Sequence, residues 1–428
     1  MKKTTKLSRR NFLGAAATLA APLVIPASCL AGTRRAAPSE RINVGVIGLG
    51  GRAQHDLMPA FLSEKDVQCL AVCDCFADRR NAGKNLVDSR YGNQDCKAYR
   101  FHEELLGRDD IDAVIIATGD RWHAVLSVIA AKAGKDIYCE KPFTLTIGEG
   151  RSMVNAMKKY KTVWQCGTQR RSNNSYRFVA ETVQSGKIGR LHTATVFMGD
   201  GFTSNGKENP IAPPEPEVFD YDRWTGQAAL APYSGIRIAF WRQLWATGGG
   251  LICDMGPHYF DTIQWAHQSE TSGPRFFEGT AVWPPKDMFA QTPYNFNVVA
   301  QYDDGVKVIV KKGEKGIRFE GDEGWIHISD AGVLRAEPQS ILMDRKIDKQ
   351  SWRFMGGHVR NFLDCMRSRQ LTASNPELAQ RNHTICHCAN ICLRLGRKVE
   401  WDAKTERFVA DDEANAMLNR PMRAPWQI

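Results

Sequence analysis

The chain has 428 residues, which is too long for one ordinary hydrophobic core and indicates two or three packing units. Hydrophobic residues make up 43% and charged residues 24%, which excludes a disordered chain and a protein with many membrane spans. The formal charge is +10, but residues 1–31 hold five basic residues and no acid. Taking 5 from 57 leaves 52 basic against 47 acidic residues, a surplus of about five without a run of like charge. We therefore expect no nucleic-acid partner.

Residues 1–31 have the pattern of a secretory signal peptide: a basic start, an apolar Ala-rich run over 12–25, and small residues around Ser28 and Ala31. The segment Ser8-Arg9-Arg10-Asn11-Phe12-Leu13 matches the twin-arginine consensus, which addresses folded cargo. We expect periplasmic export by the twin-arginine machinery. A chance Arg pair in a general secretory signal is the alternative, and Pro26 disfavours a lipid anchor on Cys29. Because twin-arginine cargo commonly acquires its cofactor in the cytoplasm, the leader also suggests a bound cofactor.

Twelve cysteines lie mostly in apolar segments, which favours reduced, buried side chains. Five His and Cys residues lie within ten positions: His383, Cys386, His387, Cys388 and Cys392. On a helix, His383 and His387 share one face and Cys388 and Cys392 share another, so they would not converge on one metal without a partner segment, and we expect core packing and no metal site.

After a linker at 32–40, the first half alternates short apolar runs with amphipathic segments. Strands are predicted at 42–47, 67–73, 113–117 and 136–139, and helices at 56–62, 77–86, 123–133 and 147–159. This alternation predicts a doubly wound parallel sheet covered on both faces, over residues 41–165.

The second half, residues 166–345, predicts an α/β domain with an open, mainly antiparallel sheet. Its strands are expected at 191–197, 276–282, 296–302, 306–311, 316–321 and 324–329. Asp303-Asp304-Gly305 is a strong hairpin signal between two of them. Antiparallel edges favour a homo-oligomer, a dimer or tetramer.

A dinucleotide-binding turn follows the first strand, with Gly48, Gly50 and Ala53 in the pattern Gly-x-Gly-x-x-Ala. Asp74 ends the second strand, where a carboxylate binds ribose hydroxyls and repels a 2′-phosphate. NAD is therefore the expected cofactor. NADP stays an alternative because Arg79 and Arg80 follow, and a nucleotide-free Rossmann-like domain is the competing interpretation.

Two further motifs carry catalytic chemistry. Lys141 follows the strand at 136–139, at the sheet edge where ligands bind, and a cation there favours deprotonation of a substrate hydroxyl. Asp254 and His258 stand four residues apart after three glycines, so on a helix the carboxylate can orient the imidazole as a base. A capping Asp and a buried His are the alternative interpretation.

These motifs, in this order and spacing, resemble the Gfo/Idh/MocA oxidoreductases from about residue 42 onward. Four further segments resemble the exported bacterial branch of this family. They are residues 168–172, residues 222–224, and the tail segments 396–402 and 423–426. The resemblance implies a Rossmann domain, an α/β domain used for oligomerisation, and a C-terminal tail, 346–428, that returns to the first domain.

The resemblance assigns catalysis to Lys141, Asp254 and His258, with His258 as the base. It adds these cofactor-binding residues: Arg52, Thr118, Trp122, His123, Glu140 and Gln169. The family usually has Thr-Pro-x-x-x-His where this chain has Thr118-Gly119-Asp120-Arg121-Trp122-His123, so Gly119 replaces the Pro. Trp122 is expected either to stack at the nicotinamide or to belong to the core.

The expected function is oxidation or reduction of a secondary alcohol of a sugar or glycoside, with C3 of a pyranoside suggested by the resemblance, and with a tightly bound cofactor. Aromatic residues before Asp254 suit sugar rings, or else core packing. They are Trp224, Tyr233, Trp241 and Trp245. The expected substrate-binding residues are Lys141, Arg237, Trp241, Arg242 and His258. Two alternatives remain: an NAD-dependent glycoside hydrolase that oxidises transiently, and an inactive sugar-binding protein.

Overall fold

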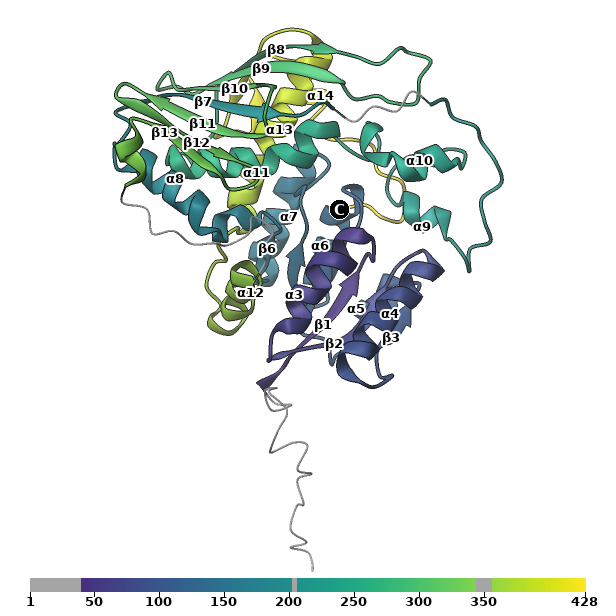
Figure 1. The fold of residues 1–428 in the computed structure, drawn as a ribbon. Helices are drawn as coiled ribbons and strands as arrows, with labels where there is room; N and C mark the ends of the chain where they lie inside the picture. Colours follow the sequence, from purple (N-terminus) through teal and green to yellow (C-terminus); the bar gives the residue numbers. More distant parts are fainter. Residues whose placement is uncertain (1–39, 202–205, 344–355) are drawn as a thin grey trace, which may run out of the picture. The chain divides into compact units, whose positions relative to one another are not determined.

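The computed structural model describes residues 40–201, 206–343 and 356–428 (Figure 1). The predicted signal peptide and nearly all of the predicted linker lie outside the described residues. Among the described residues, no helix has both the length and the apolar character that are needed to cross a membrane.

The first sheet has six parallel strands in the order β3-β2-β1-β4-β5-β6. They are β1 (Ile42–Ile47), β2 (Val67–Cys73), β3 (Lys97–Tyr99), β4 (Ala113–Ile116), β5 (Asp136–Cys139) and β6 (Trp164–Cys166). This is the strand order of dinucleotide-binding doubly wound sheets, whose ligands lie at the carboxyl ends of the strands where the order reverses. The predicted parallel sheet is therefore confirmed.

Helices cover both faces of this sheet and bury two apolar clusters against it. They are η2 (Ala53–Leu57), α3 (Met58–Ser63), α4 (Ala77–Tyr91), α5 (His102–Leu106), α6 (Arg121–Lys132) and α7 (Ile147–Tyr160). The first of them begins with a π-helical turn at η2, earlier than the predicted helix. Helix α7 begins with a capping box, in which the Thr146 hydroxyl accepts a hydrogen bond from the Glu149 amide and the Glu149 carboxylate accepts one from the Thr146 amide.

The second sheet has nine strands in the order β13-β12-β11-β7-β10-β9-β8-β14-β15. They are β7 (Leu191–Met198), β8 (Phe276–Val282), β9 (Asn295–Gln301), β10 (Lys307–Lys312), β11 (Gly316–Gly321), β12 (Gly324–Ser329), β13 (Leu334–Glu337), β14 (Val399–Asp402) and β15 (Arg407–Phe408). All its pairs are antiparallel except β7 with β10. The predicted mainly antiparallel sheet is confirmed, and Gly305, at φ +91°, forms the predicted hairpin turn.

Three helices pack on one face of this sheet: α8 (Asn174–Gln184), α11 (Gly250–Ala266) and α13 (Pro376–Leu395) (Figure 1). Short helices complete the fold: η3 (Gln169–Ser172), α9 (Tyr221–Thr225), α10 (Gly235–Ala239), η4 (Trp241–Gln243), η5 (Gln339–Leu342), α12 (Gly356–Ser368) and α14 (Asp412–Ala416). The side chains of His383 and the four Cys and His residues that follow it on α13 are buried. His383 accepts a hydrogen bond from the Phe143 amide at 2.9 Å.

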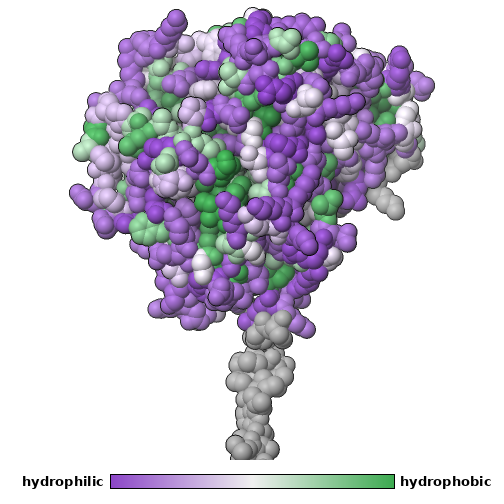
Figure 2. Space-filling view, turned by 180° about the vertical axis from the view of Figure 1, so that it is seen from behind, coloured by the Kyte–Doolittle hydropathy of each residue, from purple (hydrophilic) through white to green (hydrophobic). Residues whose placement is uncertain are grey.

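Residues after 355 contact both sheets. The ring of Phe362 on α12 packs edge-on against Phe61 and Tyr138 of the first domain. Strand β14 pairs with β8 of the second sheet, and Trp426 packs edge-on against Trp122. Figure 2 shows the opposite side of the molecule, where hydrophilic residues predominate and apolar residues form separate stretches.

Candidate active site

The glycine-rich turn after β1 has the backbone that a pyrophosphate site needs. Gly48 has φ +89°, and a Cβ there would lie 2.7 Å from backbone atoms of Ala117 and Thr118, so only glycine fits. A Cβ on Gly50 would meet nothing within 4 Å, which leaves its backbone open to a ligand. A helix follows this turn directly, and in dinucleotide sites the N-terminal amides of such a helix bind the phosphates.

Asp74 ends β2 beside this turn and is 7% exposed. Its carboxylate accepts hydrogen bonds from the amides of Leu49, at 2.6 Å, and Phe76, at 2.9 Å. Burial raises the pKa of Asp74, while these two bonds and the charge of Arg79 oppose the rise. The guanidinium of Arg79 lies 4.0 Å from the centre of the Phe76 ring and lines the cavity. Arg80 is instead bonded to the carbonyl oxygens of Asp74 and Glu217.

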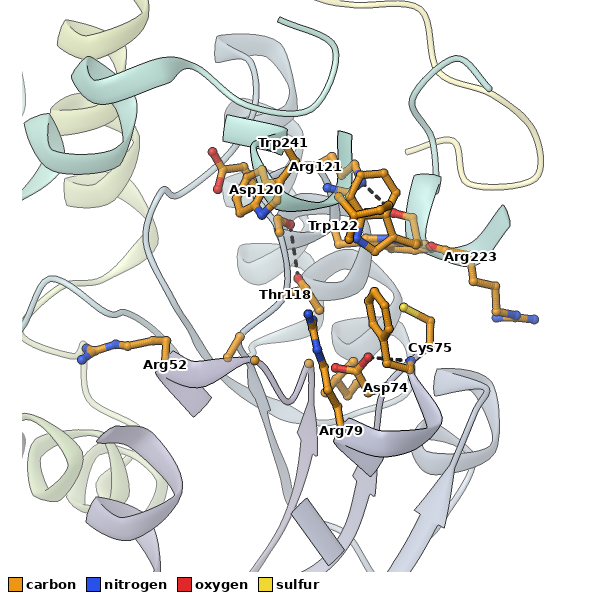
Figure 3. Close-up of a pocket in the computed structure, with 18 of the residues that line it drawn as sticks. Arg52, Asp74, Cys75, Arg79, Thr118, Asp120, Arg121, Trp122, Arg223 and Trp241 are labelled. Carbon is orange, nitrogen blue, oxygen red and sulfur yellow. Dashed lines mark hydrogen bonds between the residues drawn. The ribbon is translucent and has the colours of Figure 1, made fainter. Parts of the chain in front are cut away.

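A cavity of about 730 Å³ extends from this turn to the second domain (Figure 3). Seven cations and four acids line it. They are Arg52, Arg79, Arg100, Arg121, Lys141, Arg223 and Arg242, with Asp74, Asp120, Glu140 and Asp254. The excess of three positive charges suits a ligand that carries a pyrophosphate.

At the far end of the cavity, Lys141 and Asp254 meet from the two domains. The Lys141 Nζ donates to the Asp254 carbonyl oxygen at 2.9 Å and to its Oδ1 at 3.0 Å. Arg242 Nε donates to the same Oδ1 at 3.1 Å. Burial opposes ionisation of Asp254, but the charges of Lys141 and Arg242 outweigh it and lower the pKa of Asp254. The carboxylate therefore stays ionised and fixes both cations.

His258 lies one turn after Asp254 on α11, as predicted, but the two side chains are not paired. The Asp254 carboxylate is bonded to Lys141 and Arg242, and the buried His258 Nδ1 has no hydrogen-bond partner among the described residues. The prediction that Asp254 orients His258 is therefore wrong in this structure, because two cations compete for that carboxylate. Burial, with the nearby charges of Arg170, Lys141 and Arg52, lowers the pKa of His258 far below its usual value. The imidazole is neutral at pH 7 and is not among the residues that line the cavity.

The start of α6 contributes two side chains that the sequence motifs did not identify, the N-cap residue Asp120 and the first helical residue Arg121. Arg121 is 2% exposed, donates through Nε to the Trp224 carbonyl at 2.8 Å, and lies 4.0 Å from the centre of the Trp224 ring. A Cβ on Gly119 would lie 2.7 Å from Arg121 Nη1. A side chain at position 119 would therefore require this guanidinium to shift, whereas glycine leaves it in place.

Trp122 and His123 mainly support the cavity wall. Trp122 lines the cavity but is 6% exposed, and its indole N–H donates to the Arg223 carbonyl at 2.9 Å. It therefore belongs largely to the core. His123 is fully buried behind the wall, bonded to the carbonyls of Pro142 and Thr118, so it positions the segment that carries Lys141. His123 therefore does not reach the cavity, and Trp122 reaches it with only a small part of its surface.

A segment of the second domain, residues 217–224, lies over the end of β2. We call it the strap. The Ala77 amide donates to the Val218 carbonyl at 2.9 Å, and the Asp220 amide donates to the Cys75 carbonyl at 3.1 Å. The rings of Phe76 and Phe219 stack at 3.9 Å. Ion pairs from Arg100 to Glu217, at 3.3 Å, and from Arg223 to Glu103, at 2.8 Å, add to these contacts. The strap thus joins the second domain to the backbone next to Asp74.

The other predicted site residues divide into two groups. The predicted residues that line the cavity are Gly48, Gly50, Arg52, Asp74, Thr118, Trp122, Glu140, Lys141, Trp241, Arg242 and Asp254. Those that do not are Ala53, His123, Gln169, Arg237 and His258.

Each of the remaining exceptions has a physical cause. Arg237 turns to Glu208, at 2.6 Å, so the substrate role predicted for it lacks support. Ala53 is fully buried in the helix, and Gln169 is 3% exposed. Trp224, Trp241 and Tyr233 form part of the cavity wall, whereas Trp245 lies against the guanidinium groups of Arg394 and Arg420.

The fold and the cavity define a dinucleotide-binding protein of two domains. The family model of the oxidoreductase family's NAD-binding Rossmann fold matches residues 42–168, and that of its C-terminal alpha/beta domain matches residues 173–428. The chain therefore belongs to the Gfo/Idh/MocA oxidoreductase family. NAD, the expected cofactor, is confirmed by this NAD-binding domain.

Curated relatives include a myo-inositol 2-dehydrogenase of Thermotoga maritima, 27% identical over 226 residues, which are 52% of this chain and 54% of that protein. The rhizopine catabolism protein MocA of Rhizobium meliloti is 26% identical over 294 residues, 67% of this chain and 75% of that protein. An inositol 2-dehydrogenase of Salmonella typhimurium is 29% identical over 150 residues, 35% of this chain and 43% of that protein. The chain thus spans about half the length of the first relatives it matches.

Solved structures share the fold. An aldose-aldose oxidoreductase from Caulobacter crescentus, complexed with glycerol, has a TM-score of 0.64 and 17% identity, covering 84% of this chain and 99% of that one. An oxidoreductase from Agrobacterium radiobacter, in complex with NAD+, L-tartaric acid and magnesium, has a TM-score of 0.60 and 17% identity, covering 84% and 98%. At these identities the likeness shows the fold alone.

Proposed function

We propose that this protein is an NAD-dependent oxidoreductase that acts on a secondary alcohol of a sugar or glycoside and keeps its nucleotide bound. The observation that carries this proposal is the group formed by Lys141, Asp254 and Arg242 at the end of the dinucleotide cavity. The side-chain nitrogens of Lys141 and Arg242 lie 2.9–3.1 Å from the Asp254 oxygens that accept their hydrogen bonds. Relatives named for inositol and for 1,5-anhydro-D-fructose support a polyhydroxylated ring as substrate. C3 of a pyranoside is the first position to test.

The residues present fit NAD: Gly50 leaves room at the turn, and Asp74 stands at the strand end for ribose hydroxyls. When bound, NAD supplies a hydride acceptor. Lys141 uses two of its three N–H groups on Asp254, so its third can bond the substrate hydroxyl and stabilise the negative charge that develops there. We propose His258 as the proton acceptor, because its imidazole is neutral and lies one turn after Asp254 on α11; since it does not line the cavity in this structure, its ring must approach Lys141 when the substrate binds.

The strap supports the tightly held nucleotide in this proposal. Its hydrogen bonds and stacked rings lie on the residues directly after Asp74, next to the site for the adenosine ribose. Release of the nucleotide therefore requires the strap to open. A retained cofactor favours a cycle that returns it to its starting state, either exchange between two sugars or transient oxidation during glycoside hydrolysis, and the latter is the second candidate function.

The test is absorbance at 340 nm of the purified, nucleotide-loaded protein while single sugars and glycosides are added, with Lys141→Met as control. We expect a rise with particular sugars that the variant lacks. Release of a chromogenic aglycone without a net rise would establish the hydrolase instead. If the absorbance at 340 nm does not change with any sugar of a broad panel, although sugars still bind, the protein is a sugar-binding protein and not an enzyme of this kind.

We also propose export as a folded protein to the periplasm by the twin-arginine pathway, on the strength of residues 8–13 alone. Replacing Arg9 and Arg10 by Lys should keep the protein in the cytoplasm, and unchanged export would contradict this.

We further propose a homo-oligomer. Half-buried Val299, Ile309 and Trp325 on the second sheet, which point away from the helix-covered core, support it, and light scattering tests it.

A further inference from the structure

The carboxylate of Asp120 is a buried group of the cavity that the proposed mechanism does not use. Asp120 stands at the N-cap position of α6, yet its side chain forms no capping hydrogen bond. It is 3% exposed and lines the cavity. Figure 3 shows its carboxylate at the end of the drawn group away from Asp74 and Arg79.

Asp120 lies within the electrostatic reach of four charged groups: Arg242, Asp254, Lys141 and Arg121. Lys141 and Arg242 nevertheless both bond to Asp254, and within the described residues no hydrogen bond or ion pair joins either of them to Asp120. Nη1 of Arg121, also buried, has no hydrogen-bond partner in the described residues. The same wall of the cavity therefore has an acceptor and a donor that the protein does not satisfy.

Buried polar groups are nearly always hydrogen-bonded, and leaving one without a partner is costly. A carboxyl group that lacks a protein partner and faces a cavity is therefore a position for a ligand hydroxyl. Asp254 cannot serve in this way as readily, because its Oδ1 already accepts from two cations.

We propose that Asp120 is a specificity-determining residue whose carboxyl group bonds a second hydroxyl of the substrate while Lys141 bonds the hydroxyl at the reacting carbon. This inference rests on the proposed function. It predicts a preference for rings with several hydroxyls over simple secondary alcohols, because only the former engage both residues at once. Loss of one hydrogen bond to a charged or buried group typically weakens binding by tenfold or more.

The test is binding to nucleotide-loaded protein, measured by the change in intrinsic tryptophan fluorescence, to which the cavity residues Trp122, Trp224 and Trp241 contribute. The probes are D-glucose, methyl α-D-glucopyranoside and myo-inositol, each with its singly deoxygenated derivatives. The proteins are wild type, Asp120→Ala, Asp120→Asn and Asp109→Ala, an exposed control on the same domain.

We expect Asp120→Ala to bind the best parent probe about tenfold more weakly. One deoxy derivative should bind wild type and this variant equally, because it lacks the hydroxyl that Asp120 bonds. That derivative identifies the hydroxyl. Asp120→Asn, which keeps an acceptor of similar shape, should lose less, and Asp109→Ala should match wild type. An equal loss of affinity for every derivative, or affinities of Asp120→Ala within twofold of wild type, would overturn the role assigned to Asp120. The proposed function would stand in that case. If no probe binds wild type, the proposed function fails and this inference with it.

Discussion

The ionisation of Asp120 should make the stability of the protein depend on pH. Burial, assisted by Asp254 and opposed by Arg242, Lys141 and Arg121, raises the pKa of Asp120 from 3.8 to about 7. The folded protein therefore holds this proton more tightly than the unfolded chain does, and it loses stability as pH rises from about 4 to about 7. At about 1.4 kcal/mol per pKa unit, the full loss is about 4 kcal/mol, of which roughly 3 kcal/mol develops between pH 5 and 8.5.

Asp120→Asn removes this titration and should leave the wall intact. The melting temperature of the variant minus that of wild type should therefore increase from pH 5 to pH 8.5. With an unfolding entropy of about 2 cal/mol/K per residue, 3 kcal/mol corresponds to about 3–4 °C for a chain of this size.

The assay is differential scanning fluorimetry of the nucleotide-free proteins at one scan rate, with Asp109→Asn as the matched control. A difference that stays within 1 °C over this pH range would refute the assignment of a buried, unpaired carboxyl group.

Three further results are expected. Asp254→Asn should lower kcat/KM by about 10²-fold or more, because Lys141 and Arg242 lose the carboxylate that fixes them; turnover within threefold of wild type would count against this role. Phe219→Ala should release bound NAD about tenfold faster, since the strap loses its stacked ring, and nucleotide retained after gel filtration measures this; unchanged retention would show that the strap does not hold the nucleotide. Asp74→Ser should raise the NADP-to-NAD ratio of kcat/KM at least tenfold, because the carboxylate that repels a 2′-phosphate is gone, and an unchanged ratio would contradict that.

The sequence was most informative where burial imposes a simple pattern. The strands Ile42–Ile47 and Val67–Cys73 have the predicted bounds, because strands of a covered parallel sheet are continuous apolar runs. Strands Lys97–Tyr99 and Trp164–Cys166 were missed, because three residues are too few to show a period.

The partners of the charged groups could not be predicted in the same way. Spacing within one helix placed Asp254 one turn from His258, but its actual partner Lys141 lies 113 residues away and comes from the other domain. Asp120 has the sequence position of an ordinary helix cap, and only the fold shows that its carboxylate faces the cavity instead. Pairings of this kind depend on tertiary structure, which local sequence patterns do not encode.

In the proposed reaction, hydrogen moves between a sugar carbon and the bound nucleotide. The most direct measurement uses a sugar that the 340 nm assay identifies, deuterated at the candidate carbon, followed by mass spectrometry of the nucleotide released from the protein. We expect one deuterium in the reduced nucleotide and none when Lys141→Met is used. Reduced nucleotide without deuterium from any ring position, or a nucleotide that never becomes reduced, would contradict it.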